Sequence, residues 1–238
     1  MGDTGIKWRK VWERKAKSIS ASVTLANLLA ADGFDTGTGI FPVNSWLEFV
    51  SRIMRRFNLK SGDRVLEVGC GAGAFLFPLY TRGIDVYGVD YSDNQIALCR
   101  RVMKGGIFKV GEANKLPFND GSFDVVISNS VFQYFPDLKY AEEVVTEMDR
   151  VTKSRGCIGI FDVNDIEKKE NFIKTRKEKL GEKEYERLYG DLEHMFYSRA
   201  WFRRIAMRYG FECEIEDQSI EGYLNSFFRY NVFFKKKF

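Results

Sequence analysis

Residues that bind metals or form disulfides are scarce in this sequence. Among 238 residues there is one histidine, His194, and there are four cysteines. The cysteines lie far apart, at positions 70, 99, 157 and 213, and no two have the spacing of a metal-binding pair. We therefore expect neither a bound metal nor a disulfide framework, and scattered thiols of this kind are typical of a reducing compartment.

Long apolar runs are also missing. Residues 1–17 are polar and charged, and the apolar stretch from Val23 to Ala31 is much shorter than the roughly 20 residues that span a bilayer. It also lies too far along the chain to be the core of a secretory signal. These features predict a cytoplasmic protein that does not insert stably into a membrane.

An excess of one charge is absent as well. The net charge is +4, from 37 basic and 33 acidic residues, and no basic stripe stands out. The composition therefore predicts no nucleic-acid partner. The 45% hydrophobic content and the 21 phenylalanines are enough for a sizeable core, and the length suits one domain with additions.

The most informative feature that is present lies at Val65–Gly73. It reads as a buried strand that runs into a turn with glycine at positions 69, 71 and 73, and Asp90 closes the next strand. Glycines let a ligand approach the backbone closely, and a carboxylate at a strand end can accept hydrogen bonds from both ribose hydroxyls. No lysine follows the turn to hold a phosphate, so the pattern favours a nucleoside over a nucleotide.

Strands and helices are predicted to alternate through the middle of the chain. Strands are expected at 64–69, 84–90, 106–111, 123–128, 155–162, 211–215 and 227–234. Helices are expected at 73–81, 93–103, 137–151 and from Ser198 to Tyr209. Such alternation implies right-handed crossovers. The predicted fold is therefore an α/β, doubly wound, mostly parallel seven-stranded sheet.

Two segments outside this alternation are predicted to be helical additions. Residues 1–60 form an N-terminal cap with one helix in 7–31 and a second from about Ser45, capped by Asn44. The main domain covers 61–238, and it carries a highly charged helical insertion at 165–195, after the fifth strand.

Four blocks in this order resemble the class I S-adenosylmethionine-dependent methyltransferases of the small-molecule type. They are the glycine-rich Val65–Gly73, the acidic Val89–Ser92, the block from Gly111 to Val126, and Arg150–Gly156 before the fifth strand. The resemblance covers about residues 61–163 and implies S-adenosylmethionine as the cofactor.

The resemblance also implies which residues hold this cofactor. The backbone N–H groups of the loop 69–73 would bind its carboxylate, Asp90 its ribose, and Tyr91 one face of its adenine. The full set of implied cofactor residues is Glu67, Gly69, Cys70, Gly71, Gly73, Asp90, Tyr91, Glu112, Ala113 and Asn129. Glu67 could contact the cofactor or orient the loop, and the residues leave both roles open.

Methyl transfer from a sulfonium requires mainly proximity and orientation, so the sequence determines catalytic residues poorly. His194, with an ordinary pKa, would be a suitable base for a hydroxyl or amine at neutral pH, and Asp162 at the end of the fifth strand is the second candidate. Each could instead be structural, His194 as a surface or capping residue and Asp162 as a cap or loop acceptor.

Aromatic residues are dense near the expected mouth of the site and predict a pocket for a ring or a sugar. The predicted substrate-binding residues are Trp8, Trp12, Phe132, Gln133, Tyr134 and Tyr197. The function that we predict is methyl transfer to an oxygen of a small molecule, a sugar-like or aromatic secondary metabolite, and a nitrogen or carbon acceptor stays open as an alternative. Alternatives are a tRNA or protein methyltransferase and a cofactor-binding scaffold without catalysis. The oligomeric state and the methyl acceptor stay open.

Overall fold

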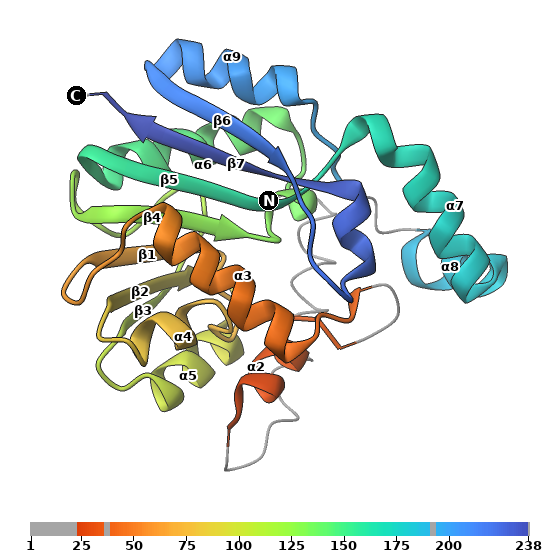
Figure 1. The fold of residues 1–238 in the computed structure, drawn as a ribbon, viewed down its shortest axis with the longest axis horizontal. Helices are drawn as coiled ribbons and strands as arrows, with labels where there is room; N and C mark the ends of the chain where they lie inside the picture. The colour runs from red at the N-terminus through yellow and green to blue at the C-terminus, as the bar shows by residue number, and fades with distance from the viewer. Residues whose placement is uncertain (1–22, 36–38, 191–193, 238) are drawn as a thin grey trace.

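A single seven-stranded sheet forms the centre of the computed structural model, which describes residues 23–35, 39–190 and 194–237 (Figure 1). The strand order is β3-β2-β1-β4-β5-β7-β6. The strands are β1 (Arg64–Val68), β2 (Asp85–Asp90), β3 (Ile107–Val110), β4 (Phe123–Asn129), β5 (Thr152–Asn164), β6 (Phe211–Asp217) and β7 (Arg229–Lys236). β7 is antiparallel to β5 and β6, and the other pairs are parallel. The predicted fold class is confirmed.

The central strands are buried on both faces, which is why they read as continuous apolar runs. Val65, Leu66 and Val68 of β1 are fully buried. The predicted strand limits differ from the observed ones mainly in β5, which begins three residues earlier than expected and ends at Asn164. The last strand begins two residues later than predicted because residues 224–228 form a 3-10 turn, η5.

Helices cover both faces of the sheet. They are α2 (Leu25–Ala31), α3 (Val43–Arg56), α4 (Leu76–Tyr80), α5 (Asp93–Val102), α6 (Leu138–Val151), α7 (Lys169–Leu180), α8 (Glu182–Tyr189) and α9 (Arg199–Tyr209), with 3-10 turns η3 (Phe132–Tyr134), η4 (Ile166–Lys168) and η5 (Leu224–Phe228). One core packs α2, α3, α4 and α5 against one face of the sheet, and a second packs α6 and α9 against the other.

Local capping explains several helix limits. Ser92, Asp137 and Ser198 each accept a hydrogen bond from a backbone N–H in the first turn of α5, α6 and α9. Gly210, at a φ of 73°, ends α9 as expected. The expected cap at Asn44 is wrong, because α3 begins at Val43 and places Asn44 inside its first turn.

The charged stretch predicted as an insertion holds η4, α7 and α8, which extend beyond the edge of the sheet in Figure 1. At the other end of the chain, the predicted helix in 7–31 lies partly outside the described residues, and α2 is the part that they contain. Among the described residues, the helices are too short or too polar to cross a bilayer.

Candidate functional site

The carboxyl ends of three neighbouring parallel strands meet at one cavity. β1 leads into the loop 69–73, β2 ends at Asp90, and β4 ends at Asn129. These segments line a cavity with a volume of about 510 Å³, within the range of small-molecule sites. Ligands in open α/β sheets bind at this edge, so the cavity is the candidate site.

Nine of the ten predicted cofactor residues line this cavity. They are Glu67, Gly69, Cys70, Gly71, Asp90, Tyr91, Glu112, Ala113 and Asn129. Gly73 does not, because it faces α5 instead. A Cβ built there would lie 2.5 Å from Met103 Cε and 3.1 Å from Cys99 Sγ, so this glycine lets the loop pack on the helix.

Asp90 holds the glycine loop to the end of β2. Its Oδ2 accepts a hydrogen bond from the Gly71 N–H at 3.0 Å, and its Oδ1 accepts one from the Ser92 N–H at 2.9 Å. The Gly69 and Cys70 N–H groups both donate to the Val89 carbonyl, at 2.7 and 3.0 Å. Asp90 is 7% exposed and lines the cavity, so it can still face a ribose.

A residue that the motifs did not indicate, Asp32, binds the same loop. Asp32 follows the last residue of α2, and its carboxylate accepts hydrogen bonds from the Ala72 N–H at 2.6 Å and the Ala74 N–H at 3.1 Å. The Gly73 N–H donates to the Cys70 carbonyl at 2.9 Å. Every N–H group of the loop 69–73 therefore has an acceptor within the protein. The prediction that these groups bind the cofactor carboxylate stays a prediction, and it requires Asp32 to give up the N–H groups of Ala72 and Ala74.

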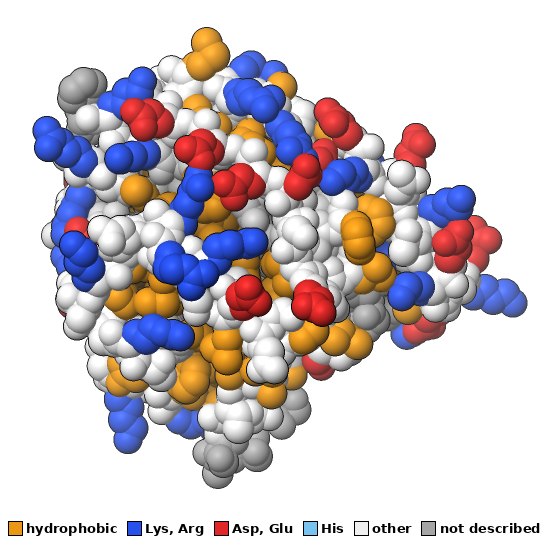
Figure 2. Space-filling model, in the orientation of Figure 1, with side chains coloured by type: hydrophobic (Ala, Val, Ile, Leu, Met, Phe, Trp, Pro, Cys, Tyr) orange, Lys and Arg blue, Asp and Glu red, His pale blue; other side chains and the backbone are white. Residues whose placement is uncertain are grey.

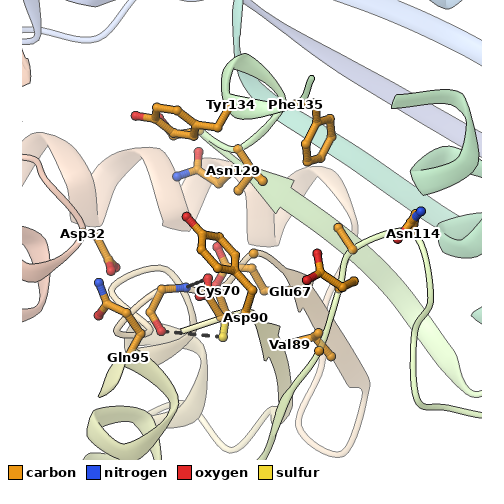
Figure 3. A pocket seen from close by; sticks show the side chains of 18 of the residues that line it. Asp32, Glu67, Cys70, Val89, Asp90, Gln95, Asn114, Asn129, Tyr134 and Phe135 are labelled. Atoms are coloured by element: carbon orange, nitrogen blue, oxygen red, sulfur yellow. Dashed lines mark hydrogen bonds between the residues drawn. The ribbon is translucent and has the colours of Figure 1, made fainter. Parts of the chain in front are cut away.

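Glu67 lies in the cavity wall near Asp90 and Cys70 (Figure 3). It is 3% exposed, and its Oε2 has no hydrogen-bond partner among the described residues. Burial raises the pKa of Glu67 well above its ordinary value, and the carboxylates of Asp32 and Asp90 raise it further. A buried oxygen without a donor at a cavity wall is suited to a ligand that brings a cation or a donor.

Glu67→Gln should stabilise the protein, and increasingly so at higher pH. The folded pKa of Glu67 lies above the unfolded value near 4.5, so its contribution to stability is present below that value and is lost as pH rises through the folded pKa. Relief of an uncompensated buried group is worth about 1–3 kcal/mol, or about 2–12 °C in melting temperature for a chain of this size. Thermal melts between pH 4 and pH 9 test this.

The control for that series is Glu212→Gln on β6, whose side chain is exposed and which should leave the melting temperature almost unchanged at every pH. A melting temperature for Glu67→Gln that lies below that of the wild type at pH 8 would contradict the proposed electrostatic strain at Glu67.

Polar side chains from the block that begins at Gly111 and from α6 also line the cavity. Tyr140 OH donates to Glu112 Oε2 at 3.4 Å, and Asn114 Nδ2 donates to Glu143 Oε2 at 2.9 Å. Burial and the neighbouring Glu112 raise the pKa of Tyr140, so this hydroxyl stays protonated and is a donor. Acidic side chains outnumber basic ones in the cavity lining: Asp32, Glu67, Asp90, Glu112, Asp137 and Glu143 stand against Lys139.

Aromatic rings line the part of the cavity next to Asp32 and the end of β4. Phe34 and Trp46 contact each other with ring centroids 5.0 Å apart, and Tyr134 and Phe135 follow β4. Trp46 Nε1 donates to the Ala74 carbonyl at 3.0 Å, so α3 is tied to the end of the glycine loop. Acidic and aromatic surfaces thus adjoin in one cavity.

Of the predicted substrate-binding residues, Tyr134 lines the cavity and Phe132, Gln133 and Tyr197 do not. These three are at most 1% exposed. Tyr197 OH donates to the Phe132 carbonyl at 2.8 Å, and Gln133 Nε2 donates to the Ser130 carbonyl at 2.8 Å. They support the turn after β4, and their role in substrate binding stays a prediction. Trp8 and Trp12 lie outside the described residues.

His194 lies behind Tyr134 and does not line the cavity. Its ring centroid is 5.6 Å from that of Tyr134 and 5.9 Å from that of Tyr189. Burial lowers the pKa of His194 well below 6.5, and the nearby Arg176 and Arg229 lower it further. The expectation of an ordinary pKa is wrong, because the imidazole stays neutral at physiological pH. Its role as a base stays a prediction, with Tyr134 between it and the cavity.

Asp162 also lies outside the cavity lining, and several side chains bind its carboxylate. Oδ2 accepts from Ser130 Oγ at 2.7 Å and from Tyr223 OH at 3.0 Å, and Oδ1 accepts from Gln218 Nε2 at 2.8 Å. Arg229 Nη1 lies 3.4 Å from Oδ2. Asp162 is linked to the cavity through Ser130, which lines it, so the structure supports a positioning role.

Sequence patterns did not reveal Asp32 and Trp46, because their partners lie far away in the chain. Asp32 nevertheless carried a local signal. A carboxylate at the C-terminal end of a helix meets the negative end of the helix dipole, which is unfavourable. Such a residue indicates a tertiary role, here the binding of two backbone N–H groups.

Metal chemistry receives no support from the described residues, where no three histidine, cysteine or carboxylate side chains are grouped to hold an ion. The residues do fit a nucleoside with a cationic end. Glycines at 69 and 71 keep the cavity wall clear, since a Cβ at Gly69 would lie 2.5 Å from Val131 Cγ2.

Comparisons with known proteins agree with this site. Residues 66–160 match a family model described as a methyltransferase domain. The demethylmenaquinone methyltransferase of Geobacillus kaustophilus (strain HTA426) is 33% identical over 132 residues, which cover 52% of this chain and 55% of that protein. The chain spans about half the length of the curated relatives that it matches first.

Solved structures share the fold over most of the chain. The PH0226 protein of Pyrococcus horikoshii OT3 has a TM-score of 0.66 at 22% identity, covering 87% of this chain and 99% of that one. Magnesium protoporphyrin IX methyltransferase from Synechocystis PCC 6803, solved with bound SAH, has a TM-score of 0.64 at 16% identity, covering 98% and 100%. Residues 66–160 therefore resemble a methyltransferase domain, and the solved structures show that the chain shares their fold.

Proposed function

We propose that the protein transfers a methyl group from S-adenosylmethionine to a small molecule, as an O-methyltransferase of an aromatic or sugar-like acceptor. The observation that carries this proposal is the cavity itself, where the acidic wall at Glu67 and Asp90 adjoins the rings of Phe34, Trp46 and Tyr134. One ligand with a cationic end and one with a ring or sugar can lie next to each other there.

In this proposal the chain binds and orients, and the cofactor supplies an electrophilic methyl group on a sulfonium. On transfer, the acceptor oxygen would gain the methyl carbon, and the electron pair of the carbon–sulfur bond would stay on sulfur. The acceptor proton would pass to solvent water. Burial raises the pKa of Tyr134, so its hydroxyl stays protonated and can donate to the acceptor oxygen or to a neighbouring group.

The aromatic part of the cavity excludes water from the reacting groups. Phe34 is 9% exposed and Trp46 is 1% exposed, and both come from the segment before β1. The part of the predicted cap that the structure describes therefore supplies one wall of the site. We propose that residues 1–60 act as a cap over the domain 61–238 and that 165–195 is an insertion beside it.

Charge favours a small molecule over RNA in this proposal. Lys139 is the basic residue of the cavity lining, where six carboxylic side chains lie. On the face drawn in Figure 2, acidic side chains are interspersed among the lysines and arginines. Phosphate-rich substrates are bound by clustered basic residues, which this arrangement does not provide.

The test is product formation with defined acceptors. Purified protein should produce S-adenosylhomocysteine when S-adenosylmethionine is mixed with a panel of phenols, hydroxylated heterocycles and sugars, and mass spectrometry should locate the added methyl on oxygen. The same panel with amines, unfractionated tRNA and a protein extract distinguishes the alternatives. Methylation of tRNA or protein alone would contradict the proposal, and tight cofactor binding with no turnover on any class would favour the scaffold.

A further inference from the structure

The amides of the glycine loop leave no donor for an anion. Gly69 and Cys70 donate to the Val89 carbonyl, Gly71 to Asp90, and Gly73 to the Cys70 carbonyl. Ala72 and Ala74 donate to the two oxygens of Asp32. The usual electropositive character of such a loop is therefore neutralised from within the protein.

Carboxylates dominate the surface that remains. Asp32, Glu67 and Asp90 lie at the same side of the cavity, across from Tyr134 and Phe135 (Figure 3). Glu67 is 3% exposed and its Oε2 has no partner among the described residues. The three carboxylates are close enough that the charges of Asp32 and Asp90 both raise the pKa of Glu67. This wall is suited to a positive charge.

Asp32 is the member of this wall that the domain motifs do not include. It comes from the segment before β1, 40 residues before its partner Ala72, and it is fixed by two hydrogen bonds of 2.6 and 3.1 Å. Gln95 Nε2 donates to the carbonyl of the preceding residue, Ala31, at 3.0 Å, which holds the end of α2 against α5. The carboxylate of Asp32 is therefore held rigidly at the cavity.

We propose that Asp32 is a specificity-determining residue of the cofactor site, whose charge makes the cavity prefer the cationic methyl donor over its neutral thioether product. This inference rests on the proposed function, because it requires S-adenosylmethionine as the ligand. The donor carries a sulfonium and the product does not, so a fixed negative charge nearby stabilises the donor complex selectively. The preference would favour release of product after each turnover.

Calorimetry on the full chain tests the inference without any methyl acceptor. The ligands are S-adenosylmethionine, S-adenosylhomocysteine and sinefungin, an analogue with an amine in place of the sulfonium methyl. In Asp32→Asn, the dissociation constants of the two cationic ligands should rise about 5–20-fold, and that of S-adenosylhomocysteine should rise no more than about 3-fold. A larger loss of affinity for the cationic ligands than for S-adenosylhomocysteine would report the charge of Asp32. A merely structural role would weaken all three ligands equally.

Two further variants separate charge from shape. Asp32→Glu keeps the charge but alters the fit to the loop, so all three affinities can fall while their ratio stays that of the wild type. Asp35→Asn, at an exposed carboxylate three residues along the same segment, removes one negative charge away from the cavity lining and should change none of the affinities by more than about 2-fold.

Other outcomes overturn the inference in distinguishable ways. An equal loss for all three ligands in Asp32→Asn would mean that Asp32 only shapes the loop. Tighter binding of all three would mean that Asp32 competes with the cofactor carboxylate for the N–H groups of Ala72 and Ala74. Binding of none of them to the wild-type protein would overturn the proposed function, and this inference with it.

Discussion

Gly71→Val should abolish cofactor binding. Gly71 has a φ of +50°, and a Cβ built on it would lie 2.2 Å from Asp32 Oδ1 and 2.9 Å from Asp32 Cγ. A β-branched residue is strained at this φ and would push Asp32 away from the N–H groups of Ala72 and Ala74. We expect the affinity for S-adenosylmethionine to fall at least about 100-fold, which is about 2.8 kcal/mol, in a calorimetric titration.

Gly121→Val is the matched control for this substitution. Gly121 has a φ of +57°, and a Cβ there would have no neighbour within 4 Å. The control therefore introduces similar backbone strain at an exposed turn without touching the site. It should lower the melting temperature and leave cofactor affinity almost unchanged. Affinity within about 3-fold of the wild type in Gly71→Val, with folding verified by circular dichroism, would show that the loop does not contact the cofactor.

The sequence predicted the sheet well because its signals are local. Buried strands such as β1 read as apolar runs, and the glycines at 69 and 71 stand where a side chain would meet Val131 or Asp32. The predicted cofactor residues at the ends of β1, β2 and β4 could be placed together for a related reason. The carboxyl ends of parallel strands lie at one edge of the sheet. These features depend on residues that are neighbours in the chain or on the topology of the sheet.

The part of the site formed by residues before β1 depends on contacts between residues far apart in the chain, which a single sequence does not report. Trp46 reaches Ala74 across 28 residues, and Asp32 reaches Ala72 across 40. The loop amides looked available for an anion because nothing in the motif indicates that a carboxylate from an earlier helix binds two of them. His194 looked like an ordinary base because the sequence does not show that Arg176 and Arg229 lie close to it.

Asp162 illustrates how an acidic residue at a strand end can be misread as a base. It has a φ of +59° next to an irregularity between β5 and β7, and Ser130, which binds it, has a φ of +58°. Two residues in this uncommon conformation, one directly after β4 and one inside β5, indicate a backbone that tertiary contacts hold in place. Their hydrogen bond joins the cavity wall to the buried pair of Asp162 and Arg229.

Asp162→Ala should therefore destabilise the whole domain. Arg229 is 3% exposed, and without Asp162 its guanidinium would be buried with no paired carboxylate among the described residues. Removal of one partner of a buried ion pair costs about 3–5 kcal/mol, which corresponds to a fall of about 6–20 °C in melting temperature for a chain of this size. Ser130, Gln218 and Tyr223 would each lose an acceptor as well. Differential scanning calorimetry measures the effect.

The control is Asp217→Ala, which removes a carboxylate with a 67% exposed side chain that pairs with Arg199 and Lys168. Exposed ion pairs contribute at most about 1 kcal/mol, so this variant should melt within about 4 °C of the wild type. Arg229→Met, combined with Asp162→Ala, should recover part of the lost stability because it removes the stranded charge. If Asp162→Ala alone melted like the wild type, the buried network would not hold the strand ends together, and a direct catalytic role for Asp162 would be the better explanation.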